Sequence, residues 1–295
     1  MRLTLAIKRY LWGTACDYVY SIVKTPLIIP SSLFLLLMLI ATPLCAQDFE
    51  VAPVVLEFDA EPATNQVKTL NVKNHSSKPL AFIVSMADFL PSQDGQNEVQ
   101  PAGSSKNSCA NWLTVNPSFF EIAPGGDIAL QVNMLVPGEE LKTAWCMLYL
   151  QPTREQTSWG ADRELSTGVV VSGRIGVHIF QSPKSLRNHS IKVSNFHEVY
   201  QGGPSRQFAA VLENMGDCIT PCKIFMMLSR LDGAVDNAAD QRIDVGQMVV
   251  FPKMSRSVNM VLPDNIAPGI YSLALLADYG PRYPLEGAQL QLVVK

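Results

Sequence analysis

Charged residues are scarce in this chain of 295 residues, at 17%, while hydrophobic residues make up 47%. A disordered acidic or basic tail protein has the opposite balance, so this composition predicts a globular protein. The length is sufficient for two domains, each with its own hydrophobic core.

An excess of positive charge is also missing, since the formal net charge is −3. The first 46 residues contain four basic residues and one acidic residue. Without them, 19 basic and 25 acidic residues remain, which is a net charge of −6. A surface of this sign lacks the basic patch that binds nucleic acid, so we expect no nucleic-acid partner.

Signatures of catalysis and of metal binding are absent from the sequence. It contains no G-x-S-x-G, no H-E-x-x-H and no phosphate-binding glycine loop. The four histidines show no ligand spacing. We therefore expect no enzyme activity, no cofactor, no metal and no small-molecule substrate, and an enzyme built on a β-sandwich scaffold is the least favoured hypothesis.

The N-terminus has the order of a secretory signal peptide. Basic residues precede the apolar run Ser32–Ala41, and small residues follow up to Ala46, where we expect cleavage. This predicts export to the periplasm, with no membrane span left after cleavage. An uncleaved anchor is the alternative, although the apolar run is short for a span. Lipidation at Cys45 is a second alternative, but the large Leu44 directly before it is unfavourable.

Four cysteines remain after residue 46, and an even number in an exported chain is typical of disulfides. We predict one bond in each half of the chain, Cys109 with Cys146 and Cys218 with Cys222. A zinc site is the competing interpretation, but the spacing does not form two C-x-x-C pairs and no histidine lies near them in the sequence.

From Phe49 onward, short alternating stretches are separated by turn residues, and the eleven-residue periodicity of an amphipathic helix is not found. Pro53 predicts an edge or a switch between sheets, and we interpret residues 91–108 as a long loop. In the second half, a tight corner at 263–269 precedes a strand whose Tyr271 is expected to plug a corner of the sandwich. The fold prediction is all-β: two tandem immunoglobulin-like β-sandwich domains, over 47–183 and 188–295, after a signal peptide at 1–46.

The stretch 169–183, VVVSGRIGVHIFQSP, predicts a long strand that closes the first domain. Its odd positions from Val169 to Ile179 are apolar except for Gly173, a period of two that places these side chains on one face. Pro183 ends the strand because proline cannot donate to a ladder. An ordinary core-facing strand is the alternative to an interacting one.

The residues from Phe49 to Pro183 resemble the N-terminal domain of periplasmic pilus-assembly chaperones, the PapD-like family. The resemblance rests on PVVLEFD, TLNVKN, EIAPGG, ALQVNML, AWCMLYLQP and the terminal FQSP, in that order. It is weaker over Asn188–Lys295, where it amounts to a second sandwich of suitable size. It implies two immunoglobulin-like domains.

In that family the last strand of the first domain donates alternating apolar side chains to an unfinished pilus subunit. The resemblance therefore implies a subunit-binding strand, with matching residues Val171, Ile175, Val177 and Ile179. The family also anchors the subunit's terminal carboxylate with an arginine and a lysine. Here Val54, Val55 and Leu56 occupy the arginine's region and Gly176 lies near the lysine's place, so Arg174 is the candidate anchor.

The first hypothesis is thus an exported chaperone-like protein that binds subunits of a pilus or surface fibre by strand donation from residues 169–180. The alternative is a structural or adhesive component of an envelope assembly that uses the sandwiches as spacers. The two differ in whether the edge of this strand is free or permanently paired.

Overall fold

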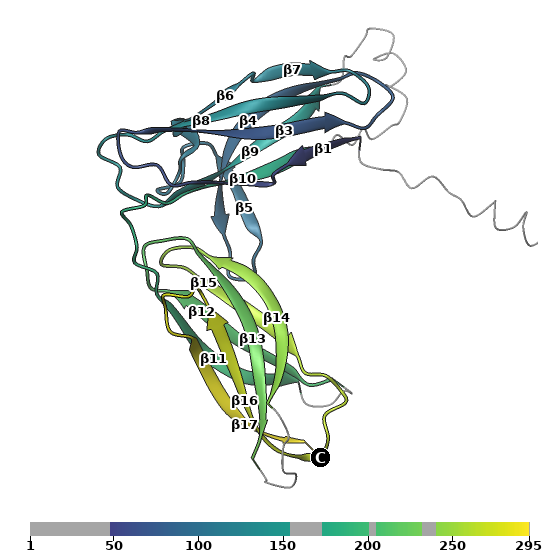
Figure 1. Cartoon of the computed structure of the whole chain (residues 1–295), viewed down its shortest axis with the longest axis vertical. Helices are drawn as coiled ribbons and strands as arrows, with labels where there is room; N and C mark the ends of the chain where they lie inside the picture. Colours follow the sequence, from purple (N-terminus) through teal and green to yellow (C-terminus); the bar gives the residue numbers. More distant parts are fainter. Residues whose placement is uncertain (1–47, 154–172, 201–204, 232–239, 295) are drawn as a thin grey trace, which may run out of the picture. The chain divides into compact units, whose positions relative to one another are not determined.

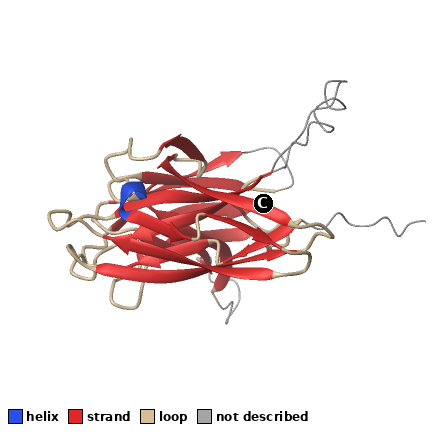
Figure 2. Cartoon of the chain, turned by 90° about the horizontal axis from the view of Figure 1, so that it is seen from above, coloured by secondary structure: helices blue, strands red, loops and turns tan. Residues whose placement is uncertain are grey.

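The computed structural model describes residues 48–153, 173–200, 205–231 and 240–294 (Figure 1). Strands make up nearly all regular structure in these ranges, with a single 3₁₀ turn, η1 (Ala110–Trp112) (Figure 2). The all-β prediction is confirmed. None of the described residues forms a helix long and apolar enough to cross a membrane.

The first ten strands form two facing sheets. One has the order β1 (Phe49–Ala52), β3 (Asn65–Asn74), β8 (Asp127–Leu135), β6 (Leu113–Asn116). The other has the order β2 (Val55–Phe58), β10 (Ile175–Gln181), β9 (Ala144–Thr153), β4 (Leu80–Pro91), β5 (Asn97–Pro101), and β7 (Phe119–Ile122) also pairs with β4. We call this the first sandwich.

The last seven strands form a second pair of sheets, which we call the second sandwich. Its sheets are β11 (Ile191–Tyr200), β12 (Gln207–Asn214), β15 (Ser255–Val261), and β14 (Gln241–Val250), β13 (Thr220–Arg230), β16 (Gly269–Asp278), β17 (Glu286–Val294). Each sandwich encloses its own apolar core. Two tandem sandwiches are therefore confirmed, while the boundaries 47–183 and 188–295 and the signal peptide at 1–46 stay predictions.

Alternation of side chains along each strand builds the cores. In β3, Leu70 and Val72 are buried, and in β8 Leu130 and Val132 are buried, while the residues between them are exposed. A fully buried side chain of this size contributes roughly 1.5–3 kcal/mol. The period of two in the sequence thus corresponds to one buried face on each of these strands.

Pro53 marks the point where the chain leaves one sheet of the first sandwich and enters the other. Before it, β1 pairs antiparallel with β3, and after it β2 pairs in parallel with β10. The predicted switch between sheets is confirmed. Its consequence is that β2 lies beside β10, the strand that the sequence singles out.

An asparagine ends β3 in the first sandwich and β12 in the second, and each stabilises the turn that follows. The Asn214 amide nitrogen donates to the carbonyl oxygens of Cys218 and Val250, both at 2.8 Å, and its side-chain oxygen accepts from the Gly216 N–H at 2.9 Å. Asn74 makes the corresponding bonds in the first sandwich. Both side chains are buried, and these hydrogen bonds satisfy their polar groups there.

The predicted loop over residues 91–108 is wrong in part, because β5 lies within it and pairs with β4. Of its five residues, Val99 alone is a large apolar side chain, and it is exposed. No buried face imposes an alternating pattern on β5, so the sequence carries no strand signal there. Backbone hydrogen bonds to the long strand β4 hold it instead.

Tyr271 takes the predicted corner position in the second sandwich. Its hydroxyl donates to the Ala267 carbonyl at 2.8 Å, and its ring is buried in the second core. The bond spans the turn before β16 and attaches that turn to the strand. This agrees with the expectation from the sequence.

Candidate functional site

Strand β10 lies between β9 and β2 and has a partner on both sides over only part of its length. It pairs antiparallel with β9 from Ile175 to Gln181, and in parallel with β2 from His178 to Gln181. Among the described residues, the β2 side of Ile175–Val177 has no strand partner. We call this stretch the open edge of β10.

The main-chain groups that point outward from the open edge follow from strand alternation. The His178 N–H donates to the Val54 carbonyl at 3.0 Å, on the β2 side. Every second residue of a strand presents its N–H and C=O on the same side, so those of Gly176 face the open edge, while Arg174 lies directly before the strand begins. An extended segment of another chain could pair with them and continue the sheet.

Two of the predicted binding residues point into the first sandwich. Val177 and Ile179 are 0% exposed and belong to its core. This burial leaves their side chains no surface for a partner as the sandwich stands. Ile175 is half-buried at the rim of that core, and Val171 lies outside the described residues. A role for these four residues in subunit binding stays a prediction.

Arg174 is exposed and lies directly before the open edge, outside β10. The central carbon of its guanidinium group lies 3.8 Å from the centre of the Tyr149 ring, a cation–π contact. The ion pairs found among the described residues do not include Arg174. A stacked guanidinium keeps its planar set of N–H donors available, which suits a two-bond contact with a carboxylate.

Gly176 leaves space for the Tyr149 ring, on which the Arg174 guanidinium stacks. A Cβ at this position would lie 2.9 Å from the Met147 sulfur and 3.0 Å from Cε1 of Tyr149. Because the side chains of β9 lean over β10 here, a larger residue would displace Met147, Tyr149 or both. A side chain at position 176 therefore fits only if these neighbouring side chains shift.

The side chain of His178 lies on the outer face of β10 and contacts β4 and β5. Its ring packs edge-on against Phe89, with centroids 5.4 Å apart, and its Nε2 lies 3.1 Å from the side-chain nitrogen of Asn97. Burial lowers the pKa of His178 and favours the neutral ring. A neutral Nε2 accepts a hydrogen bond from the Asn97 amide, which ties β5 to β10.

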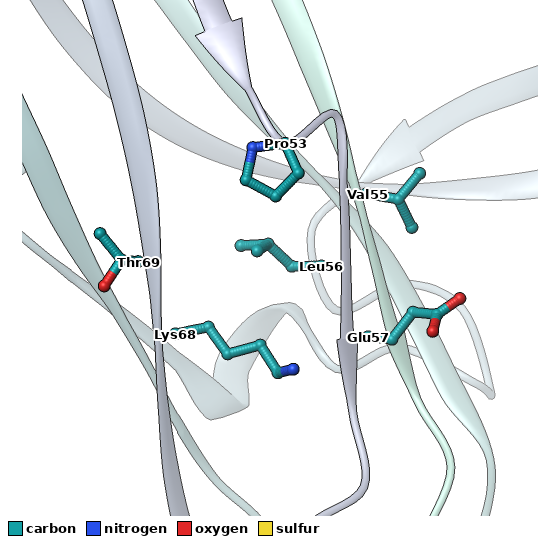
Figure 3. Close-up of a pocket in the computed structure, with 6 residues that line it drawn as sticks. All are labelled: Pro53, Val55, Leu56, Glu57, Lys68 and Thr69. Atoms are coloured by element: carbon teal, nitrogen blue, oxygen red, sulfur yellow. The ribbon is translucent and has the colours of Figure 1, made fainter.

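A hollow of about 480 Å³ lies on the other side of β2, between β2 and β3 (Figure 3). Pro53 borders it at the end where the chain switches sheets. Leu56 and Lys68 point into it from β2 and β3, whereas Val55 and Glu57 point away. Lys68 thus brings a positive charge to a position between the two sheets.

The four cysteines are thiols in this structure. The sulfur atoms of Cys109 and Cys146 are 3.4 Å apart, longer than a covalent bond of about 2.05 Å. Burial raises the pKa of Cys109 well above its ordinary value. Cys218 and Cys222 contact different carbonyls, those of Leu186 and Thr220, and burial raises the pKa of Cys222 to about 12. Both disulfides stay predictions.

The sequence did not single out Tyr149, Met147 and Asn97, which complete the site. In β9, Trp145, Met147 and Tyr149 alternate with residues buried in the core, so both faces of the strand are apolar. That continuous apolar run was the available signal for a covered outer face. No signal in the sequence pointed to Asn97, because its strand, β5, was interpreted as part of a loop.

No family model matches the sequence, and no curated protein matches it either. Solved structures with a similar arrangement of strands are numerous. A chain from a chaperone–tip adhesin complex of CFA/I fimbriae biogenesis has 10% identity and a TM-score of 0.48, with coverage of 82% of this chain and 97% of that one.

The class 5 fimbriae chaperone CfaA has 11% identity and a TM-score of 0.44, with coverage of 84% and 100%. The E. coli chaperone DraB has 14% identity and a TM-score of 0.39, with coverage of 83% and 98%. All three TM-scores are below 0.5, so we draw no functional conclusion from them.

Proposed function

We propose that this protein is an exported, periplasmic chaperone-like protein that binds subunits of a pilus or surface fibre. Binding occurs by pairing of a subunit segment with the strand predicted over residues 169–180. The observation that carries this proposal is the open edge of β10, which presents the main chain of Gly176 directly before the part covered by β2, with Arg174 directly before its start.

Backbone pairing provides affinity that depends little on sequence, and Arg174 adds selectivity for a carboxylate. Its guanidinium is held over Tyr149, so less side-chain freedom is lost when a partner binds. A hydrogen bond to a charged group contributes roughly 1.5–3 kcal/mol. Loss of the guanidinium is therefore expected to weaken client binding by roughly ten- to a hundredfold.

The experiment is a pull-down from envelope extract with residues 47–295 as bait and mass spectrometry of the captured proteins. We expect a small β-rich subunit in roughly one-to-one amount. Arg174→Ala and Ile175→Asp should both reduce its capture. Arg242→Ala is the matched control, because that guanidinium also stacks on a ring, Phe225, at 3.9 Å, but lies in the second sandwich.

Capture that is unchanged in folded Arg174→Ala and Ile175→Asp proteins would refute binding at the open edge. Recovery of a large stable assembly instead would favour the alternative, a structural or adhesive component. One observation favours this alternative: β2 pairs with His178–Gln181, so the edge of the second half of β10 is already covered.

A further inference from the structure

Lys68 occupies a position that strand alternation assigns to the sandwich interior. Its neighbours on the same face of β3 are Gln66 on one side and the buried Leu70 on the other. The side chain passes the Phe58 ring, with its ammonium 5.8 Å from the ring centre, and reaches into the hollow beside β2 (Figure 3). A lysine directed between two layers has lost part of its hydration.

The carboxylate next to this ammonium is engaged by other groups. Asp59 forms an ion pair with Lys184 at 3.2 Å and accepts a hydrogen bond from the Gln66 amide at 2.9 Å. Glu57 borders the hollow but points away from it (Figure 3). The ion pairs found among the described residues do not include Lys68.

Within the part of the chain that the structure describes, the same hollow borders a second strand edge without a strand partner, on β3. Strand β1 pairs with β3 only as far as Ala52 opposite Asn71, and the chain then switches sheets. On this side of β3, the His75 N–H donates to the Asp48 carbonyl at 2.9 Å. Alternation along the strand puts the N–H and C=O of Thr69 and Val67 on the same side, beyond the end of β1.

We propose that an extended acidic segment of a protein partner binds in this hollow. It continues the ladder where β1 ends, by pairing with the main chain of Val67 and Thr69. A carboxylate on its inward-facing side chain pairs with Lys68. This site is separate from the open edge of β10 and does not depend on the function proposed above.

The charge of Lys68 selects among possible segments. A lysine beside an open edge disfavours pairing with an apolar strand, since the ammonium would be buried without a partner. An acidic residue at the inward position removes that penalty and adds a charge-assisted hydrogen bond. The preference for an acidic over a neutral segment thus follows from one residue.

The test uses residues 47–295 and two blocked heptapeptides of alternating valine and threonine, one with a central aspartate and one with a central asparagine. In an NMR titration, the aspartate peptide should shift the amide signals of Val67 and Thr69. It should bind about tenfold more tightly than the asparagine peptide. A main-chain N-methylated aspartate peptide should bind weakly, because it cannot complete the ladder.

Lys68→Gln should abolish the difference between the two peptides. Lys73→Gln is the matched control, since Lys73 lies on the same strand but is exposed on its outer face, and it should preserve the difference. Equal binding of the two peptides to the unmodified protein, or no binding, would overturn the proposal without any variant. Shifts at Gly176 and His178 in place of Val67 and Thr69 would overturn it as well and assign the peptide to β10.

Discussion

Replacement of Ile179 by alanine tests whether the inner face of β10 packs in the core or binds a partner. Ile179 is 0% exposed and lies directly opposite Cys146 of β9 and Leu56 of β2, both of which are buried. Its side chain therefore has packed neighbours on both adjacent strands. We expect the substitution to reduce stability rather than the affinity for a partner.

The magnitude follows from the carbon atoms removed. At about 0.8 kcal/mol for each buried methylene equivalent, isoleucine to alanine costs about 2.4 kcal/mol in transfer free energy. The cavity left among close-packed neighbours raises this within the usual range of about 2–5 kcal/mol. Ile179→Val removes a single carbon and should cost about 0.5–1.5 kcal/mol.

Urea unfolding followed by tryptophan fluorescence measures the loss of stability of the first sandwich. The tryptophans of residues 47–295 are Trp112, Trp145 and Trp159, and all three precede the second sandwich in the chain. The unfolding midpoint should fall by at least about 1 M for a slope of about 2 kcal/mol/M. Ile83→Ala, at a residue of β4 that is 47% exposed, is the matched control and should have a much smaller effect.

A loss below about 1 kcal/mol in Ile179→Ala would refute the assignment of this side chain to a closed core. A lower affinity for a captured subunit at unchanged stability would show that Ile179 is a binding contact, as the resemblance implied. One result is a change in unfolding free energy and the other is a change in affinity, so both can be measured on the same protein preparation.

Three further predictions concern single groups. Asn214→Ala should lower the unfolding free energy by about 2–4 kcal/mol, because it leaves buried carbonyls without a donor, and calorimetry would detect this as a lower Tm of the second sandwich. If the Cys109–Cys146 disulfide forms, its reduction should cost about 2–4 kcal/mol. Alkylation in denaturant followed by intact mass counts the free thiols, and a full set would contradict the bond. Burial lowers the pKa of His178 in the folded state, so its contribution is complete above the ordinary pKa of about 6.5 and is lost as the pH falls below it. His178→Gln should reduce this decline in stability, and an unchanged pH profile would contradict the assignment.

Local pattern in the sequence determined which segments are strands. Alternation along β3 and β8, the proline at position 53 and the corner before Tyr271 are properties of neighbours in the chain. Backbone conformation and the position of a buried face depend on such short-range features, so they predicted two sandwiches. The strand β5 was not predicted, because it has no buried face and therefore no alternating pattern.

For the residues that the structure describes, the tertiary structure alone decided which strand edges are open and which charges lack an ion-pair partner. The pairing of β2 with the second half of β10, the stacking of Arg174 on Tyr149 and the entry of Lys68 into the hollow all join residues that are distant in the sequence. Such contacts depend on how whole sheets pack together, which no local period encodes. For the same reason, alternation placed Val177 and Ile179 on one face of a strand, and the packing of the sheets assigned that face to the core.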